Sequence, residues 1–89
     1  MTRNEALARL ERLTAAVTAL PSDARVVDAG LTCAGYASTH AIETPGLHLQ
    51  TDCGLDLGPV IAEPDHEYDQ QYAVIEGVGF LHLVPKADR

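Results

Sequence analysis

Positive charge is missing from most of this chain. No lysine or arginine occurs between Val26 and Pro85, whereas that stretch carries nine carboxylates, and the net charge of the whole chain is -7. The six basic residues lie outside it, at Arg3, Arg9, Arg12, Arg25, Lys86 and Arg89. A surface of one sign attracts cations and basic proteins, and it repels nucleic acid and anionic membranes. The charge pattern therefore predicts a basic protein surface as partner and excludes direct binding to nucleic acid or to a membrane.

Large apolar side chains are also scarce. The 89 residues include no tryptophan and one phenylalanine, and thirteen of the apolar residues are alanines. A domain of this size buries only about 60 to 65 % of the surface that its unfolded chain exposes. We therefore expect a single domain over residues 1–89 with a thin core. Because association that buries another apolar strip would stabilise it, a homodimeric structural or assembly protein is one alternative.

Long hydrophobic runs are absent. Met1 leads directly into a charged segment, and no apolar run approaches the roughly 20 residues of a membrane span. Two cysteines are too few for a disulfide framework, and we expect both to remain thiols in a reducing compartment. These features predict a cytoplasmic protein.

Residues 3 to 20 have the pattern of an amphipathic helix. Thr2-Arg3-Asn4-Glu5 matches the capping box, in which a threonine hydroxyl accepts the backbone N–H three residues later. Apolar residues recur at helical spacing up to Pro21, which ends the pattern. They are Ala6, Leu7, Leu10, Leu13, Val17 and Leu20. We expect this leucine stripe to pack on the rest of the domain.

From about residue 25 to residue 85 the periodicity is that of strands. Apolar and polar residues alternate in residues 26–37 and 47–53, and the first of these runs places Val27 and Ala29 on its apolar face. Further strand-like runs occupy residues 40–44, 70–76 and 80–84, with residues 60–62 as a short edge strand. The predicted fold class is α+β, with the N-terminal helix packed on a small, mostly antiparallel β-sheet of four to five strands.

We expect residues 54 to 69 to form an acidic loop on the rim of the sheet. Carboxylates occupy every second position from Glu63 to Asp69, and an extended backbone would space them at about 6.5 to 7 Å, close to the phosphate spacing of a nucleic-acid strand. We therefore predict a partner-binding set with two anchoring tyrosines and three outlying carboxylates. Its members are Glu63, Asp65, Glu67, Asp69, Tyr68, Tyr72, Asp52, Asp56 and Glu76. An acidic face that only keeps the protein soluble is the simpler alternative.

Four residues could form a zinc site: Cys33, His40, His48 and Cys53. Their separations are wider than the short ligand pairs of structural zinc sites. Strand alternation also turns Cys53 toward the apolar face and His48 away from it. We predict core thiols, no metal and no cofactor, and a small zinc-binding module remains an alternative. The acidic loop lacks the glycine of a calcium-binding EF-hand.

No pattern indicates catalysis. His66 lies between Asp65 and Glu67, but sequence adjacency does not supply the convergence that a catalytic triad needs. The chain has no phosphate-binding glycine loop with its lysine and no nucleophile elbow. We therefore expect the protein not to be an enzyme.

In size, acidity and charge segregation, the chain resembles the nucleic-acid-mimicking inhibitors of phages and mobile elements, including anti-CRISPR and anti-restriction proteins. The resemblance is one of composition and covers no motif. It implies a non-enzymatic inhibitor that docks on a basic surface of a nucleic-acid-binding complex, where its carboxylates take the place of phosphates.

Overall fold

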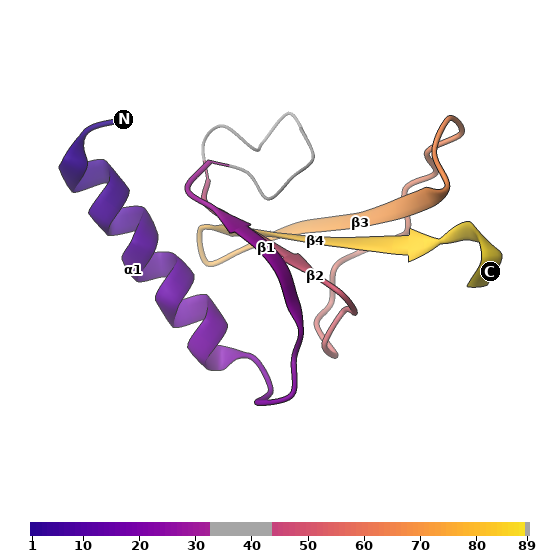
Figure 1. Ribbon diagram of the computed structural model, residues 1–89, viewed down its shortest axis with the longest axis horizontal. Coiled ribbons are helices and arrows are strands. Elements are labelled where there is room, and N and C mark those ends of the chain that lie inside the picture. The colour runs from indigo at the N-terminus through magenta and orange to yellow at the C-terminus, as the bar shows by residue number, and fades with distance from the viewer. Residues whose placement is uncertain (33–43, 89) are drawn as a thin grey trace.

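The computed structural model describes residues 1–32 and 44–88. One helix, α1 (Arg3–Ala19), precedes four strands and a short 3-10 helix (Figure 1). The strands are β1 (Val26–Gly30), β2 (Gly46–Leu49), β3 (Tyr68–Ile75) and β4 (Val78–Pro85), and the 3-10 helix is η1 (Lys86–Asp88). The predicted α+β fold is confirmed. Most of the strand expected over residues 40–44 lies outside the described residues.

Helix α1 begins at the predicted capping box. The Thr2 hydroxyl accepts the backbone N–H of Glu5 at 3.1 Å. The helix ends where Leu20 turns to an extended conformation, because a residue that precedes proline avoids the helical region. Over residues 1–32 and 44–88, no helix combines the length and apolar character needed to cross a membrane.

The four strands form one mixed sheet in the order β1-β2-β4-β3. β1 pairs antiparallel with β2, and β3 pairs antiparallel with β4, in accordance with the expected antiparallel character. The central pair, β2 with β4, is parallel. A parallel pair needs a long connection, which the irregular segment over residues 50–67 and strand β3 provide.

A tight turn joins β3 to β4. Its two central residues, Glu76 and Gly77, have φ of 50° and 78°, and Ile75 pairs with Val78 across it. Two consecutive positive φ angles are the signature of a type I′ hairpin turn. Val78 therefore starts β4.

The core lies between α1 and one face of the sheet. Leu47 and Leu49 are buried on either side of the half-buried His48, as strand alternation predicts. Among residues 1–32 and 44–88, the buried cluster comprises Leu13, Leu47, Leu49, Leu57, Val78 and Phe80. Leu57 comes from within the predicted acidic loop, so this segment is anchored in the core.

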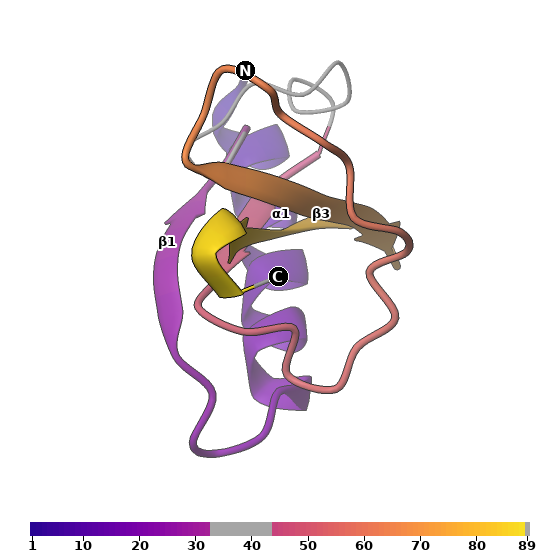
Figure 2. The ribbon, with the colours of Figure 1, turned by 90° about the vertical axis from the view of Figure 1, so that its right-hand side faces the viewer.

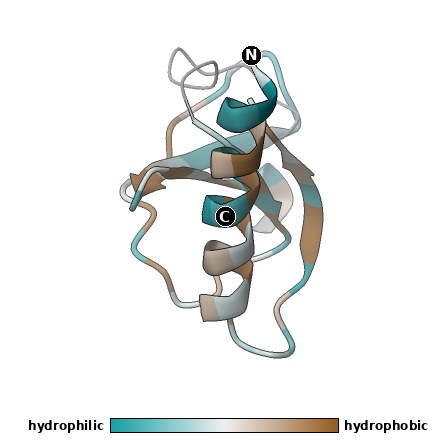
Figure 3. Cartoon of the chain, turned by 90° about the vertical axis from the view of Figure 1, so that its left-hand side faces the viewer, coloured by the Kyte–Doolittle hydropathy of each residue, from teal (hydrophilic) through white to brown (hydrophobic). Residues whose placement is uncertain are grey.

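The expectation for the leucine stripe is wrong for half of its members. Only Leu13 is buried, whereas Leu7, Leu10 and Val17 are each between 45 and 47 % exposed. Leu13 faces the sheet and belongs to the core. Leu7, Leu10 and Val17 lie on a neighbouring side of the helix, which does not face the sheet. The expected apolar face of β1 is also wrong, because Val27 and Ala29 are exposed on this edge strand. Figure 3 shows α1 in front of the sheet with β1 beside it.

Candidate functional site

A buried carboxylate anchors the acidic loop. Asp69 is 1 % exposed, and its Oδ1 accepts the backbone N–H of Glu63 at 2.9 Å. The Lys86 ammonium lies 3.8 Å from the same oxygen and donates to the Glu63 carbonyl at 2.6 Å. The backbone N–H of Lys86 donates to the Glu67 carbonyl at 3.1 Å. Asp69 and Lys86 therefore hold both ends of the segment from Glu63 to Glu67.

The loop does not have the extended geometry that its alternating carboxylates suggested. The His66 N–H donates to the Glu63 carbonyl at 3.1 Å, which closes a turn. Ile61 pairs with Gln70 through backbone hydrogen bonds of 2.6 and 3.0 Å, so the predicted edge strand is a single bridge. Gln70 also donates to the Glu63 carboxylate at 2.7 Å. The segment from Glu63 to Glu67 is therefore a turn, and its carboxylates do not form a ladder along an extended strand.

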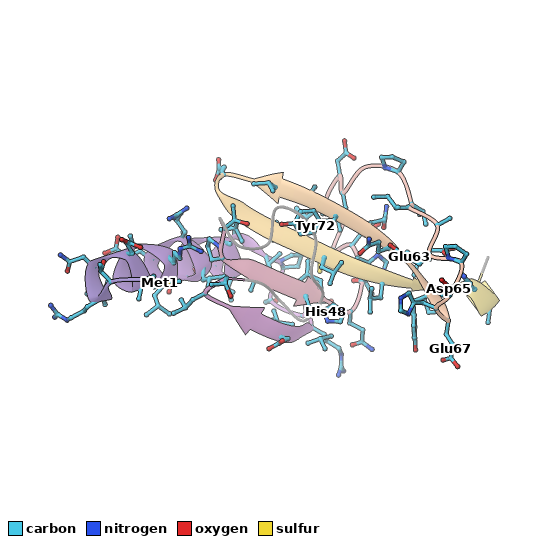
Figure 4. All side chains as sticks on the ribbon, turned by 90° about the horizontal axis from the view of Figure 1, so that it is seen from above. Met1, His48, Glu63, Asp65, Glu67 and Tyr72 are labelled. Atoms are coloured by element: carbon cyan, nitrogen blue, oxygen red, sulfur yellow. The ribbon has the colours of Figure 1, made fainter. Side chains whose placement is uncertain are left out.

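Two carboxylates of the predicted set lie at the surface of this end. Asp65 and Glu67 are exposed, and Tyr68 beside them is 42 % exposed. Figure 4 shows Glu63, Asp65 and Glu67 together at the end of the molecule opposite Met1. Figure 2 faces the same end, with η1 near the centre of the view. Asp65 and Glu67 therefore project from one part of the surface, beside the half-buried Glu63.

A groove of about 650 Å³ lies at this end, where β2 stops and β4 continues. Asp52 and Tyr68, both of the predicted set, contribute to its lining, together with His48 and His82. The Asp52 carboxylate accepts the Gly54 N–H at 2.9 Å, which holds it in a turn. The structure thus places two predicted residues on one groove. Residue spacing did not signal His82 as a groove residue, because only the register of β4 places it there.

The charge of the groove depends in part on His48. Burial lowers the pKa of His48 below its ordinary value, the nearby Asp28 carboxylate partly opposes the shift, and His82 adds to it. The lowered pKa favours the uncharged form of His48, which does not offset Asp52. His82 Nδ1 lies 3.0 Å from the side-chain oxygen of Gln71, which orients its ring.

No other residue of the predicted set lines the groove, and three of these residues have different surroundings. Asp56 holds a separate turn by accepting the Gly58 N–H at 3.0 Å. Glu76 lies at the far end of the β3–β4 hairpin, since Ile75 pairs with Val78 there and Tyr68 pairs with Pro85 at the groove end. The half-buried ring of Tyr72 lies against the position where a side chain at Gly79 would start.

The zinc candidates are only partly described. Cys33 and His40 lie outside the described residues. Cys53 packs against the core, and its thiol lies 3.6 Å from the Thr51 carbonyl. Within residues 1–32 and 44–88, no three histidine, cysteine or acidic side chains are grouped closely enough to hold a metal ion.

Comparisons with known proteins identify no relative of this chain. No protein family matches it, and neither a curated protein nor a solved structure matches it significantly. Geometry and charge are therefore the observations on which a function can be argued.

Proposed function

We propose that this chain is a non-enzymatic binding protein whose acidic end docks on a basic surface of a nucleic-acid-binding complex. The observation that carries the proposal is that the exposed carboxylates of Asp65 and Glu67 lie next to Tyr68 in the chain. Tyr68 and Asp52 both line the groove. Lys86, the cation nearest to them in sequence, already donates to the Glu63 carbonyl.

The exposed carboxylates would attract the partner, and the groove would hold it. Asp65 and Glu67 act over several ångströms and accelerate the encounter with a basic surface. A lysine or arginine side chain of the partner fits a groove of about 650 Å³. There Asp52 would pair with its charge, and the Tyr68 ring would contact its alkyl chain or stack on a guanidinium.

A nucleic-acid-binding complex suits this acidic end because its channels are lined with lysine and arginine. The anchoring of the loop at Asp69 and Lys86 adds to the argument, since preorganised carboxylates lose less conformational entropy on binding. Asp69 itself supports the loop from inside, so we assign it no direct contact with the partner.

The test is affinity capture with the tagged chain from cell lysate at about 50 mM and about 300 mM salt. Captured proteins are identified by mass spectrometry, and the main one is purified for binding measurements. The test variant is Asp65→Asn with Glu67→Gln. The matched control, Glu5→Gln with Glu76→Gln, makes the same charge change at the start of α1 and at the tip of the β3–β4 hairpin, away from the acidic end.

We expect capture of a basic nucleic-acid-binding protein at low salt, about tenfold weaker binding by the test variant, and near wild-type binding by the control. Duplex DNA should compete with the chain for the purified partner. Equal binding by the two variants would overturn the proposed site. Simultaneous binding of DNA and the chain would show that the chain does not dock on the DNA-binding surface of the partner.

A further inference from the structure

One flank of α1 is apolar and exposed. Leu7, Leu10, Thr14 and Val17 follow one another at spacings of three and four residues, the pattern of a and d positions in a helix pair. The Thr14 hydroxyl donates to the Leu10 carbonyl at 2.9 Å. Its polar atom is therefore satisfied within the helix, and covering this flank would leave no hydroxyl without a hydrogen bond.

The contacts on the opposite side of the helix show where this flank lies relative to the sheet. There Arg12, Ala15 and Ala19 line a small cavity with Glu76 at the hairpin tip. Because the sheet order is β1-β2-β4-β3, the hairpin lies at one side of the sheet and β1 at the other. The exposed flank therefore lies on the β1 side.

Strand β1 carries a further exposed apolar residue on the helix side of the sheet. Val26 pairs with Leu49, whose side chain is in the core, so Val26 lies on the helix side of the sheet, yet it is 39 % exposed. No residue of β1 belongs to the buried cluster. We name Leu7, Leu10, Val17 and Val26 the apolar flank.

We propose that the apolar flank is the interface of a homodimer, in which α1 packs antiparallel on α1 of a second copy about a two-fold axis. In this register Leu7 contacts the partner subunit's Val17, and Leu10 contacts the partner subunit's Thr14. The two-fold axis repeats both contacts, so the surface is self-complementary.

Charge favours the antiparallel arrangement. In the antiparallel pair, Arg3 at the start of one helix lies close to the partner subunit's Asp23, which follows the end of the partner helix. In a parallel pair, Arg3 would instead lie beside the partner subunit's Arg3. Near the axis, Glu11 approaches the partner subunit's Glu11. This repulsion weakens the dimer, so neutralising Glu11 is expected to strengthen association.

The area of the flank predicts a weak dimer. Four side chains that are roughly half exposed offer on the order of 300 Å² per copy, against about 800 Å² per partner in stable interfaces. The contact remains useful to a domain with a thin core, because association stabilises the folded state by mass action.

The experiment is sedimentation velocity on the full chain between about 10 µM and about 1 mM, with circular dichroism to verify folding. Leu10→Gln is the disrupting variant, and Ala8→Gln is its control on another exposed side of α1. Glu11→Gln tests the register. Asp65→Asn with Glu67→Gln separates dimerisation from the acidic docking site.

We expect the wild-type mass to rise from 9.5 kDa toward twice that value. Leu10→Gln should weaken association about tenfold or more, Glu11→Gln should strengthen it severalfold, and the two other variants should match the wild type. A monomer at every concentration would overturn the proposal, and so would a dimer that Leu10→Gln leaves unchanged. Weaker association of Glu11→Gln would overturn the antiparallel register.

Discussion

Replacing Asp69 by alanine should cost a substantial part of the stability of this domain. The change removes the acceptor of the part-buried Glu63 N–H, and a buried donor left without its partner costs about 1 to 3 kcal/mol. It also removes the carboxylate beside Lys86, but that ammonium is 38 % exposed and keeps the Glu63 carbonyl as acceptor. The charge contribution is therefore only about 0 to 1 kcal/mol.

Together these contributions predict a loss of about 1 to 4 kcal/mol. A domain of this length has a total stability of roughly 4 to 13 kcal/mol, so the loss is large. Asp69→Asn keeps an oxygen for the Glu63 N–H and should cost only about 1 kcal/mol.

Urea unfolding followed by circular dichroism measures both variants, and the melting temperature should fall by about 4 to 8 °C for each kcal/mol lost. A loss below about 0.5 kcal/mol for Asp69→Ala would refute the anchoring role. An equal loss in Asp69→Asn would show that charge, and not the hydrogen-bond acceptor, is what the loop needs.

Gly79→Ala should lower the unfolding free energy by about 1 to 3 kcal/mol, because a Cβ there would approach the Tyr72 ring carbon Cζ to 2.9 Å. In a Tyr72→Ala background most of that loss should disappear in urea unfolding, and additive losses would contradict the clash. Glu76→Asn should raise the unfolding free energy by roughly 0.5 kcal/mol, because asparagine suits a φ of 50° in a type I′ turn, and a lower melting temperature would argue against that turn. Stability should also fall as the pH drops through about 6.5, the ordinary pKa of histidine. Because the pKa of His48 is lowered from 6.5 in the folded state, the unfolded chain takes up the proton first as the pH falls. In His48→Gln the urea midpoint should depend less on pH, and an unchanged pH dependence would contradict the role of His48.

Several elements follow from local sequence because neighbouring residues determine them. The capping hydrogen bond between Thr2 and Glu5 needs only four consecutive residues. The burial of Leu47 and Leu49 about His48 follows from the two-residue period of a strand. These patterns predicted the helix, most of the strands and the α+β class.

The candidate site was less accessible from sequence. The exposed position of Asp65 and Glu67 agrees with their polarity, but nothing in the alternation from Glu63 to Asp69 distinguishes the one carboxylate that is buried. Its burial depends on Lys86 and on the pairing of β3 with β4, which bring together residues that are distant in the chain.

The sequence by itself determined the charge of this protein, its helix and the alternation of its strands, because these properties depend on residue type and short spacing. Only the tertiary structure decided the parallel pairing of β2 with β4, the groove beside Tyr68 and the side of α1 that meets the sheet. The helix shows the reason. Leu10 and Leu13 are equivalent in the helical pattern, and only the position of the sheet buries one and exposes the other.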